Sequence, residues 1–445
     1  MSGAKCNSHE AHSINSRHMK LQVNLKMMRR CSLLIAFLFC TNHLLWLDAV
    51  GVHNWSSLFN NNPSKNWVVL VAGTNTWENY RHQADVFDAY HVVRKNNVPA
   101  ENIITFAYDD IANNPRNPFK GQVFHDCMHE DVYQGVVIDY RGKDVTRDNF
   151  VKVSKGDEKL AANKKKVLKC GPDDNVFIFY SGHGLVSRIS LVAEEYNKLV
   201  LYVEACYSGS LFRNILPRNV GIYVTTSAKE NEQSWSIFCD EKYFDVCLAS
   251  EYAYAWIGDS QYHDLKTRTL DQQYQEVRKR TWHSHVMKYG EMAIGSLLVG
   301  QFQGHYDLPN HRNDGTIPAN AVDRKPSFQA HLFSKSRRLM EATMEQEHET
   351  AWRKLHRAIQ LGQIVKETTR DIVVYVTSHH KPTLDGLSKR DELMCFRAVF
   401  DQFRTHCFTI QQVREVAQHT THLMALCKAG YKAETLIYSV YNVCS

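Results

Sequence analysis

The sequence has little glycine and proline, no long apolar run, and almost no excess charge outside its first 50 residues. Twenty-one glycines and 10 prolines among 445 residues exclude a collagen-like or low-complexity chain. The first 50 residues hold six basic and two acidic side chains, so they carry +4 of the total +6. Because nucleic-acid binding usually needs a basic face or stripe, the remaining +2 argues against a nucleic-acid partner.

Motifs for metals and cofactors are also missing. No cysteine and histidine cluster has the spacing of a zinc site, and no glycine-rich loop has the pattern of a phosphate site. The sequence therefore predicts neither a metal nor an organic cofactor. Its composition, 44% hydrophobic and 22% charged, is that of a globular protein, and its length predicts two or three domains.

Residues 1–49 have the features of an N-terminal extension and signal peptide. A basic stretch at Lys26–Arg30 precedes an apolar run at Leu33–Phe39, and Ala49 offers a small residue for cleavage. A membrane anchor is the alternative, but Thr41–His43 interrupts the run well short of about 18 apolar residues. We expect a secreted chain without a membrane span, glycosylated at the sequon that begins at Asn54.

Residues 50–303 have the pattern of an α/β domain. Short apolar runs alternate with helical segments, which predicts parallel β-α-β units with both faces of the sheet covered. A helix is expected over Ala84–Arg94, where apolar side chains share one face. Strands are expected at Trp67–Ala72, Ile103–Ala107, Val176–Tyr180, Leu199–Val203 and Gly221–Thr226.

The pattern changes after residue 303. We expect a linker or activation peptide over 304–345, polar and proline-containing up to residue 328, and a helical domain over 346–445. Helical spacing predicts helices at Ser334–Thr369, Asp391–Phe403, Ile410–Leu426 and Ala433–Tyr441. Four cysteines in this region predict two disulfides, for which three connectivities are possible: Cys395, Cys407, Cys427 and Cys444.

Nine of the 12 cysteines follow the predicted leader, so at least one thiol stays unpaired. The spacing does not predict how Cys127, Cys170, Cys239 and Cys247 are paired.

Two strand ends carry the residues for nucleophilic catalysis. His183 follows the strand at Val176–Tyr180, and Cys206 follows the strand at Leu199–Val203. Because ligands bind beyond the carboxyl ends of parallel strands, a thiolate and its general base would meet there. The backbone N–H groups of Gly184 and Cys206 would form an oxyanion hole. Taken singly, a buried core thiol and a turn histidine are the alternatives.

Several motifs of this sequence resemble those of the legumains, the asparaginyl endopeptidases. The resemblance covers about residues 65–444. The matching segments are Val71–Gly73, Asn79–Asp85, Tyr108–Ile111, Asp131–Gly135, His183–Gly184, Glu204–Cys206, Ser284–Met287, Gln301–Gly304 and Arg404–Phe408.

The resemblance implies a caspase-like, mostly parallel sheet flanked by helices and followed by a small helical prodomain. It implies Cys206 as the nucleophile, His183 as general base and acid, and Asn79 as the residue that orients His183. The pocket for the substrate asparagine would contain Arg81, His82 and Glu204, with Ser234 on the substrate side. A carboxamide needs a donor and an acceptor, which Arg and a carboxylate supply; a buried salt bridge between Arg81 and Glu204 is the alternative.

The resemblance further implies a zymogen that is activated at acid pH and then cleaves after Asn, or after Asp at lower pH. Its prodomain would inhibit it and carry the disulfides Cys395–Cys427 and Cys407–Cys444. Implied partners are protein and peptide substrates, this prodomain and cystatin-type inhibitors. The implied location is the lysosome or endosome, or the outside of the cell.

Three positions near the site depart from the legumain pattern. Gly182 replaces the Asp before the histidine, and Tyr207 replaces the Glu after the nucleophile. The pocket Asp is matched by Ser250, so either Glu251 takes its place or the preference for asparagine is weaker.

Two segments depart as well. His183 and Cys206 are only 23 positions apart, and both a natural deletion and a skipped exon around Leu185–Leu191 would explain this. The activation cleavage site of the family falls on Glu341 in place of Asn. Cleavage at Asn313 or Asn320, or by another protease, is the alternative.

Two rival functions follow from these departures. The first is a catalytically impaired homologue that acts as a binding or decoy protein. The intact pair of His183 and Cys206 argues against this function. The second is a peptide ligase, which the loss of the Asp before His183 disfavours.

Overall fold

The structure, a computed structural model, describes residues 65–184, 196–213, 216–305 and 323–445. The predicted leader, the sequon at Asn54, the segment Leu185–Leu191 and the candidate cleavage sites Asn313 and Asn320 lie outside the described residues.

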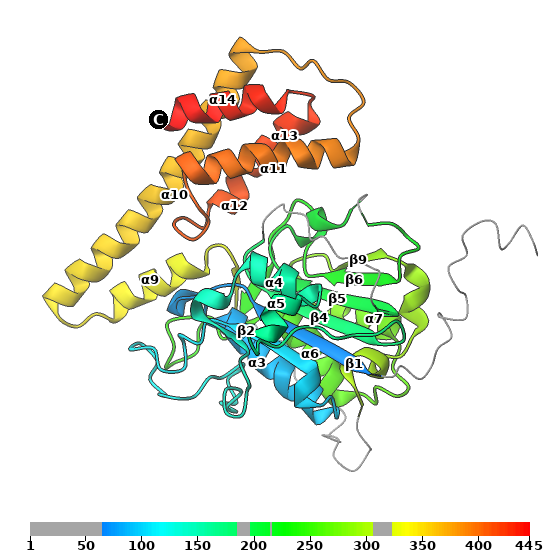
Figure 1. Ribbon diagram of the computed structural model, residues 1–445. Helices are drawn as coiled ribbons and strands as arrows, with labels where there is room; N and C mark the ends of the chain where they lie inside the picture. Colours follow the sequence, from blue (N-terminus) through cyan, green and yellow to red (C-terminus); the bar gives the residue numbers. More distant parts are fainter. Residues whose placement is uncertain (1–64, 185–195, 214–215, 306–322) are drawn as a thin grey trace, which may run out of the picture. The chain divides into compact units, whose positions relative to one another are not determined.

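A seven-stranded sheet forms the centre of the first region, as predicted (Figure 1). Its order is β3-β2-β1-β4-β5-β6-β9, and every neighbouring pair is parallel except β6 with β9. The α/β fold class is therefore confirmed. The strands are β1 (Asn66–Ala72), β2 (Ile103–Ala107), β3 (Tyr140–Arg141), β4 (Asn175–Ser181), β5 (Lys198–Glu204), β6 (Ile222–Thr226) and β9 (Met287–Gly290).

Helices cover both faces of this sheet, because each central strand is apolar on both sides. In β1, Val68 and Leu70 belong to one buried cluster, and Val69 and Val71 belong to another. The first cluster includes side chains of α3 (Tyr80–Lys95), α6 (Glu251–Tyr262) and α7 (Leu270–Arg280). The second includes side chains of α4 (Arg147–Ser154) and α5 (Glu158–Ala162); the short α8 (Gly300–Gln303) contacts β1 and β4.

A smaller antiparallel sheet has the order β10-β7-β8. It consists of β7 (Trp235–Ile237), β8 (Ala249–Ser250) and β10 (Arg324–Pro326). The proline-containing segment 304–328 was expected to be a linker, but its end forms β10. Pro326 is tolerated because β10 is the edge strand of this sheet.

The C-terminal region is all helical and has its own apolar core, which includes Phe396, Phe403 and Leu423 (Figure 1). Its helices are α10 (Glu345–His379), α11 (Lys389–His406), α12 (Val416–His419), α13 (Thr421–Lys428) and α14 (Ala433–Cys444), and α9 (Ala330–Glu341) precedes them. The disulfides Cys395–Cys427 and Cys407–Cys444 form as the resemblance implies, and Cys239–Cys247 forms a third.

Two predicted helices are wrong in extent. Ser334–Thr369 is divided between α9 and α10, because Ala342 and Met344 adopt extended backbone angles. The predicted helix Ile410–Leu426 contains only α12 and part of α13. Residues 410–412 and 414–415 form turns before α12 begins, and the Thr409 hydroxyl accepts a hydrogen bond from the Gln412 N–H in the first of them. No helix among the described residues is long and apolar enough to cross a membrane.

Candidate active site

The ends of β4 and β5 bring the two predicted catalytic residues to one edge of the sheet. Ser181 and Glu204 are paired across the parallel strands, and the Gly182 N–H donates to the Glu204 carbonyl at 3.0 Å. A Cβ added at Gly184 would overlap the Cys206 carbonyl, so these two backbones are in close contact. The short segment between β4 and β5 is therefore compatible with neighbouring parallel strands.

Cys206 is buried and forms no disulfide. Its sulfur lies 3.8 Å from the Ser234 hydroxyl. Burial raises the pKa of the Cys206 thiol, although hydrogen bonds with Ser234 and the charge of Arg81 act in the opposite direction.

The turn after Cys206 has a strained backbone. Tyr207 has a φ of 59°, in the left-handed region that a non-glycine residue rarely adopts. Its N–H donates to the Glu232 carbonyl at 2.7 Å. Glu232 in turn accepts from the N–H of His285, so the turn is tied to the loop that contains Trp282. Such strain persists only where the surroundings support it.

The surroundings of His183 favour its neutral imidazole form. Burial lowers its pKa well below the usual value, and the charges of Arg414 and Arg81 lower it further. Its Nε2 is buried and has no hydrogen-bond partner among the described residues. The ring of His82 lies edge-on to it, with ring centres 5.2 Å apart, and the Thr74 hydroxyl holds His82 at 2.7 Å.

Asn79 is buried at the end of the short 3₁₀ helix η1 (Trp77–Asn79). Its amide donates to the Asn75 carbonyl at 2.7 Å. Its Oδ1 is buried and has no hydrogen-bond partner in the part of the chain that the structure describes. A hydrogen bond that orients His183 is therefore not among the contacts of Asn79, and that role stays a prediction.

Arg81 and Glu204 provide the polar wall of the predicted pocket. Arg81 lies in the first turn of α3 and is 1% exposed; its Nη2 donates to the Ser327 carbonyl at 3.2 Å. Burial raises the pKa of Glu204 to about 8. A hydrogen bond from Ser234 acts in the opposite direction but is the smaller effect. Arg81 Nε and Glu204 Oε2 are both buried without hydrogen-bond partners among the described residues, so these two atoms do not close into a salt bridge.

Two carboxylates, Asp85 and Glu251, lie near the position of the pocket Asp, and the role of Glu251 there stays a prediction. The Ser250 N–H donates to Asp85 Oδ1 at 3.0 Å, so Asp85 accepts a hydrogen bond at this position. The charge of Asp85 also acts on Arg81 and counters the cost of burying it. Glu251 instead forms an ion pair with Arg324 of β10, with 2.7 Å between Arg324 Nε and Glu251 Oε1.

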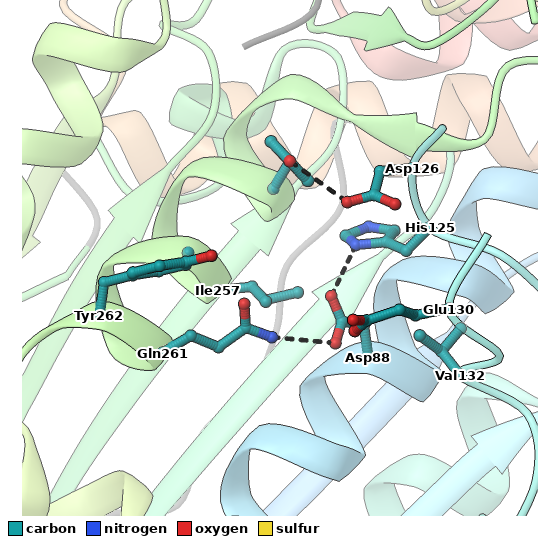
Figure 2. A pocket seen from close by; sticks show the side chains of 10 residues that line it. Asp88, His125, Asp126, Glu130, Val132, Ile257, Gln261 and Tyr262 are labelled. Atoms are coloured by element: carbon teal, nitrogen blue, oxygen red, sulfur yellow. Dashed lines mark hydrogen bonds and ion pairs between the residues drawn. The ribbon is translucent and has the colours of Figure 1, made fainter. Parts of the chain in front are cut away.

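A buried array behind this wall was missed by the sequence analysis. His125 lies 2.8 Å from Asp88, the contact that Figure 2 shows, and 2.9 Å from Asp85 on its other side. Burial alone would lower the pKa of His125, but hydrogen bonds to both carboxylates raise it to about 10. Asp85 belongs to one of the motifs quoted above, whereas His125 lies in a loop without a periodic pattern or motif.

Asp88 and His125 also line a small cavity, which Gln261 borders from α6 (Figure 2). Among the described residues, no group of three or more histidine, cysteine or acidic side chains is arranged to hold a metal ion.

Comparisons with known proteins show the family to which the chain belongs. The sequence profile of the Peptidase C13 family matches residues 66–305. The chain is 40% identical to a hemoglobinase of Schistosoma mansoni, covering 85% of this chain and 91% of the relative. It is 38% identical to a hemoglobinase of Schistosoma japonicum, covering 90% and 98%, and 36% identical to the legumain of Bos taurus, covering 85% and 93%.

Proposed function

Because the chain belongs to the peptidase C13 family, we propose that it hydrolyses peptide bonds after asparagine, and after aspartate at lower pH. The observation that carries the proposal is the meeting of two strand ends, where Gly184 contacts the backbone of Cys206 beside Arg81 and Glu204. This edge combines a thiol, an imidazole and a buried polar wall, as acyl transfer requires.

In the proposed reaction the Cys206 sulfur attacks the carbonyl carbon of the scissile bond, and His183 accepts the thiol proton. The oxyanion receives hydrogen bonds from the N–H groups of Gly184 and Cys206. His183 then gives its proton to the leaving amine, which leaves a thioester on Cys206. Water deprotonated by His183 hydrolyses the thioester and restores the neutral pair, in agreement with the directions of both pKa shifts.

The preference for asparagine would come from Arg81 and Glu204, with His82 and Ser234 beside them. Arg81 donates to the side-chain oxygen of the carboxamide, and Glu204 pairs with its amide. Both residues are buried, and each has a polar atom without a partner among the described residues, so a side chain without the carboxamide would leave them unsatisfied. Aspartate becomes acceptable at lower pH because its protonated side chain is neutral like asparagine.

Synthesis as an acid-activated zymogen is supported by contacts between the linker helix, the catalytic edge and the helical region. His331 of α9 lies 3.4 Å from Glu415. Burial raises the pKa of Glu415, so it loses its charge beside Arg414 at a higher pH than an exposed glutamate would. Glu78 differs: burial opposes its ionisation, but Lys335 and Arg116 lower its pKa to about 2. Acid would therefore act on Glu415 and leave Glu78 ionised.

A catalytically impaired binding protein is the second candidate. Two contacts favour it. The Asn79 amide bonds to the Asn75 carbonyl, although Asn79 was expected to orient His183. Glu251 is paired with Arg324, although it was expected to take the place of the pocket Asp. Peptide ligation is a third candidate activity. Product masses measured after a peptide with a free amine is added distinguish ligation from hydrolysis.

The deciding experiment is cleavage of a mixed peptide library by the purified full chain at acid pH, beside a Cys206→Ala control. Cuts after Asn that vanish in the control are expected, with products identified by mass. If an added protease opens the linker and still no Cys206-dependent cut appears, the peptidase proposal is wrong and the binding protein is favoured.

Three disulfides and the similarity to legumains support a route through the secretory pathway. We propose delivery to the lysosome or endosome, or secretion, with cystatin-type proteins as inhibitors. Fractionation of cells that express the full chain would distinguish these destinations.

A further inference from the structure

The linker strand β10 lies along the edge that leads to the nucleophile. It pairs antiparallel with β7, with Arg324 opposite Ile237 and Pro326 opposite Trp235. The next residue, Ser327, donates its N–H to the Ser234 carbonyl at 3.0 Å, and its own carbonyl accepts from Arg81 at 3.2 Å. An extended peptide can therefore bind this edge as an added strand and reach the pocket arginine.

One side chain of this strand is held by groups that suit a guanidinium. Arg324 Nε lies 2.7 Å from Glu251 Oε1, and its guanidinium lies over the Trp282 ring, 5.1 Å from the ring centre. Glu251 is 1% exposed, and the Trp282 N–H approaches the same Oε1 at 3.4 Å. These two contacts favour arginine over lysine, because only a planar guanidinium can both pair with a carboxylate and stack on an aromatic ring.

Glu251 would be left without this cation once the linker departs. Its second oxygen, Oε2, is already buried and has no hydrogen-bond partner among the described residues. A buried carboxylate without a cation is costly, so a bound peptide that supplies a guanidinium gains affinity. Lys325 does not compete for the position, since its ammonium lies over Phe333 on the other side of the strand.

We propose that Glu251 and Trp282 form a subsite for an arginine side chain of the substrate, three residues before the asparagine, and that Arg324 fills it in the intact chain. The position follows from the spacing between Arg324 and Ser327, whose carbonyl meets the pocket arginine. The inference rests on the peptidase function proposed above. It changes the expected role of Glu251 from the asparagine pocket to a neighbouring subsite.

The test uses the acid-activated full chain and peptides of one sequence with asparagine before the cleaved bond. Arginine, its neutral isostere citrulline, or lysine is placed at each of the four positions before the asparagine. At the position three residues before the asparagine, we expect the arginine peptide to have a kcat/KM at least tenfold above that of the citrulline peptide. The value for the lysine peptide should lie between the two. Elsewhere the ratio of arginine to citrulline should stay within about twofold.

Variants identify the residues responsible. Glu251→Gln should reduce the arginine-to-citrulline ratio to about one, and Trp282→Ala should reduce it about threefold. Trp352→Ala, at an exposed tryptophan of α10, is the matched control and should leave the ratio unchanged. Since Trp282 is 72% exposed, its variant is expected to fold even where Glu251→Gln does not.

Binding measurements separate this inference from the peptidase proposal. The Cys206→Ala chain, with its linker opened by added protease, is titrated with the arginine and citrulline peptides while tryptophan fluorescence is followed. The subsite is supported if the arginine peptide binds more tightly than the citrulline peptide and this difference disappears when Trp282→Ala is added. This holds even if no peptide is cut. Equal binding, or cleavage without any preference for arginine, overturns it.

Discussion

His125 and Asp85 form a fully buried ion pair, with 2.9 Å between His125 Nε2 and Asp85 Oδ1. Asp85 is also bonded to the Ser181 hydroxyl at 2.7 Å and to the Ser250 N–H at 3.0 Å. One carboxylate thus joins α3, the end of β4 and the start of α6. Because these elements carry the pocket residues, the pair stabilises the wall behind Arg81.

Replacement of His125 should destabilise the protein in a pH-dependent way. The folded pKa of about 10 lies above the ordinary value of 6.5, so the contribution is complete below about pH 6.5 and is lost as pH rises through 10. We expect His125→Asn to lower the free energy of unfolding by roughly 3–5 kcal/mol at pH 5.5, and by less at pH 9.

Urea unfolding of the full chain at pH 5.5, 7.5 and 9 measures this difference. His348→Asn, at an exposed position of α10, is the control. A loss that is the same at all three pH values would contradict a charged His125.

Replacement of Glu204 should flatten the dependence of stability on pH. Its folded pKa of about 8 lies above the ordinary 4.5, so the native state holds this proton more tightly and wild-type stability falls as pH rises from 4.5 to 8. We expect the stability of Glu204→Gln to rise by roughly 5 kcal/mol relative to wild type between these pH values. Thermal unfolding across this range tests it, with the exposed Glu347→Gln as control; parallel curves would argue against a buried neutral Glu204.

Gly184→Ala should impair catalysis far more than it impairs folding. The added Cβ would overlap the Cys206 carbonyl, so the strand ends must move apart and displace the nucleophile. A displacement of about 1 Å costs on the order of 100-fold in rate. Gly171→Ala is the matched control, because its nearest neighbour, Asp174, lies 4.0 Å from the added atom. Unchanged kcat/KM in Gly184→Ala would show that the two ends are not in contact.

The contribution of each disulfide to the free energy of unfolding should increase with the length of the loop that it closes. Cys407–Cys444 closes a separation of 37 residues, and Cys239–Cys247 closes one of eight. In the chain-entropy description, removing the first costs about 4 kcal/mol and removing the second about 2.5 kcal/mol. Denaturant unfolding of the two double Cys→Ala variants, under identical conditions, compares them. A larger loss from the shorter loop would mean that native contacts, rather than chain entropy, dominate.

Local patterns in the sequence predicted the α/β class and the strands that carry His183 and Cys206, and the resemblance to legumains implied the two disulfides of the helical region. Each depends on local signals: buried strands are continuous apolar runs, and family motifs keep their spacing. The breaks within Ser334–Thr369 and Ile410–Leu426 escaped prediction. Helical periodicity continues through both, while the turns at residues 410–415 and the extended angles at Ala342 interrupt the helical backbone.

The surroundings of the site were decided only by the tertiary structure. Asp85 meets His125 from 40 residues away, and Glu251 meets Arg324 from 73 residues away. No local pattern encodes such pairs, because a buried charge selects its partner by distance and desolvation in the folded chain rather than by spacing along it. Sequence therefore predicted a nucleophile and its base, whereas the folded structure shows which carboxylate acts on Arg81 and which one pairs with Arg324.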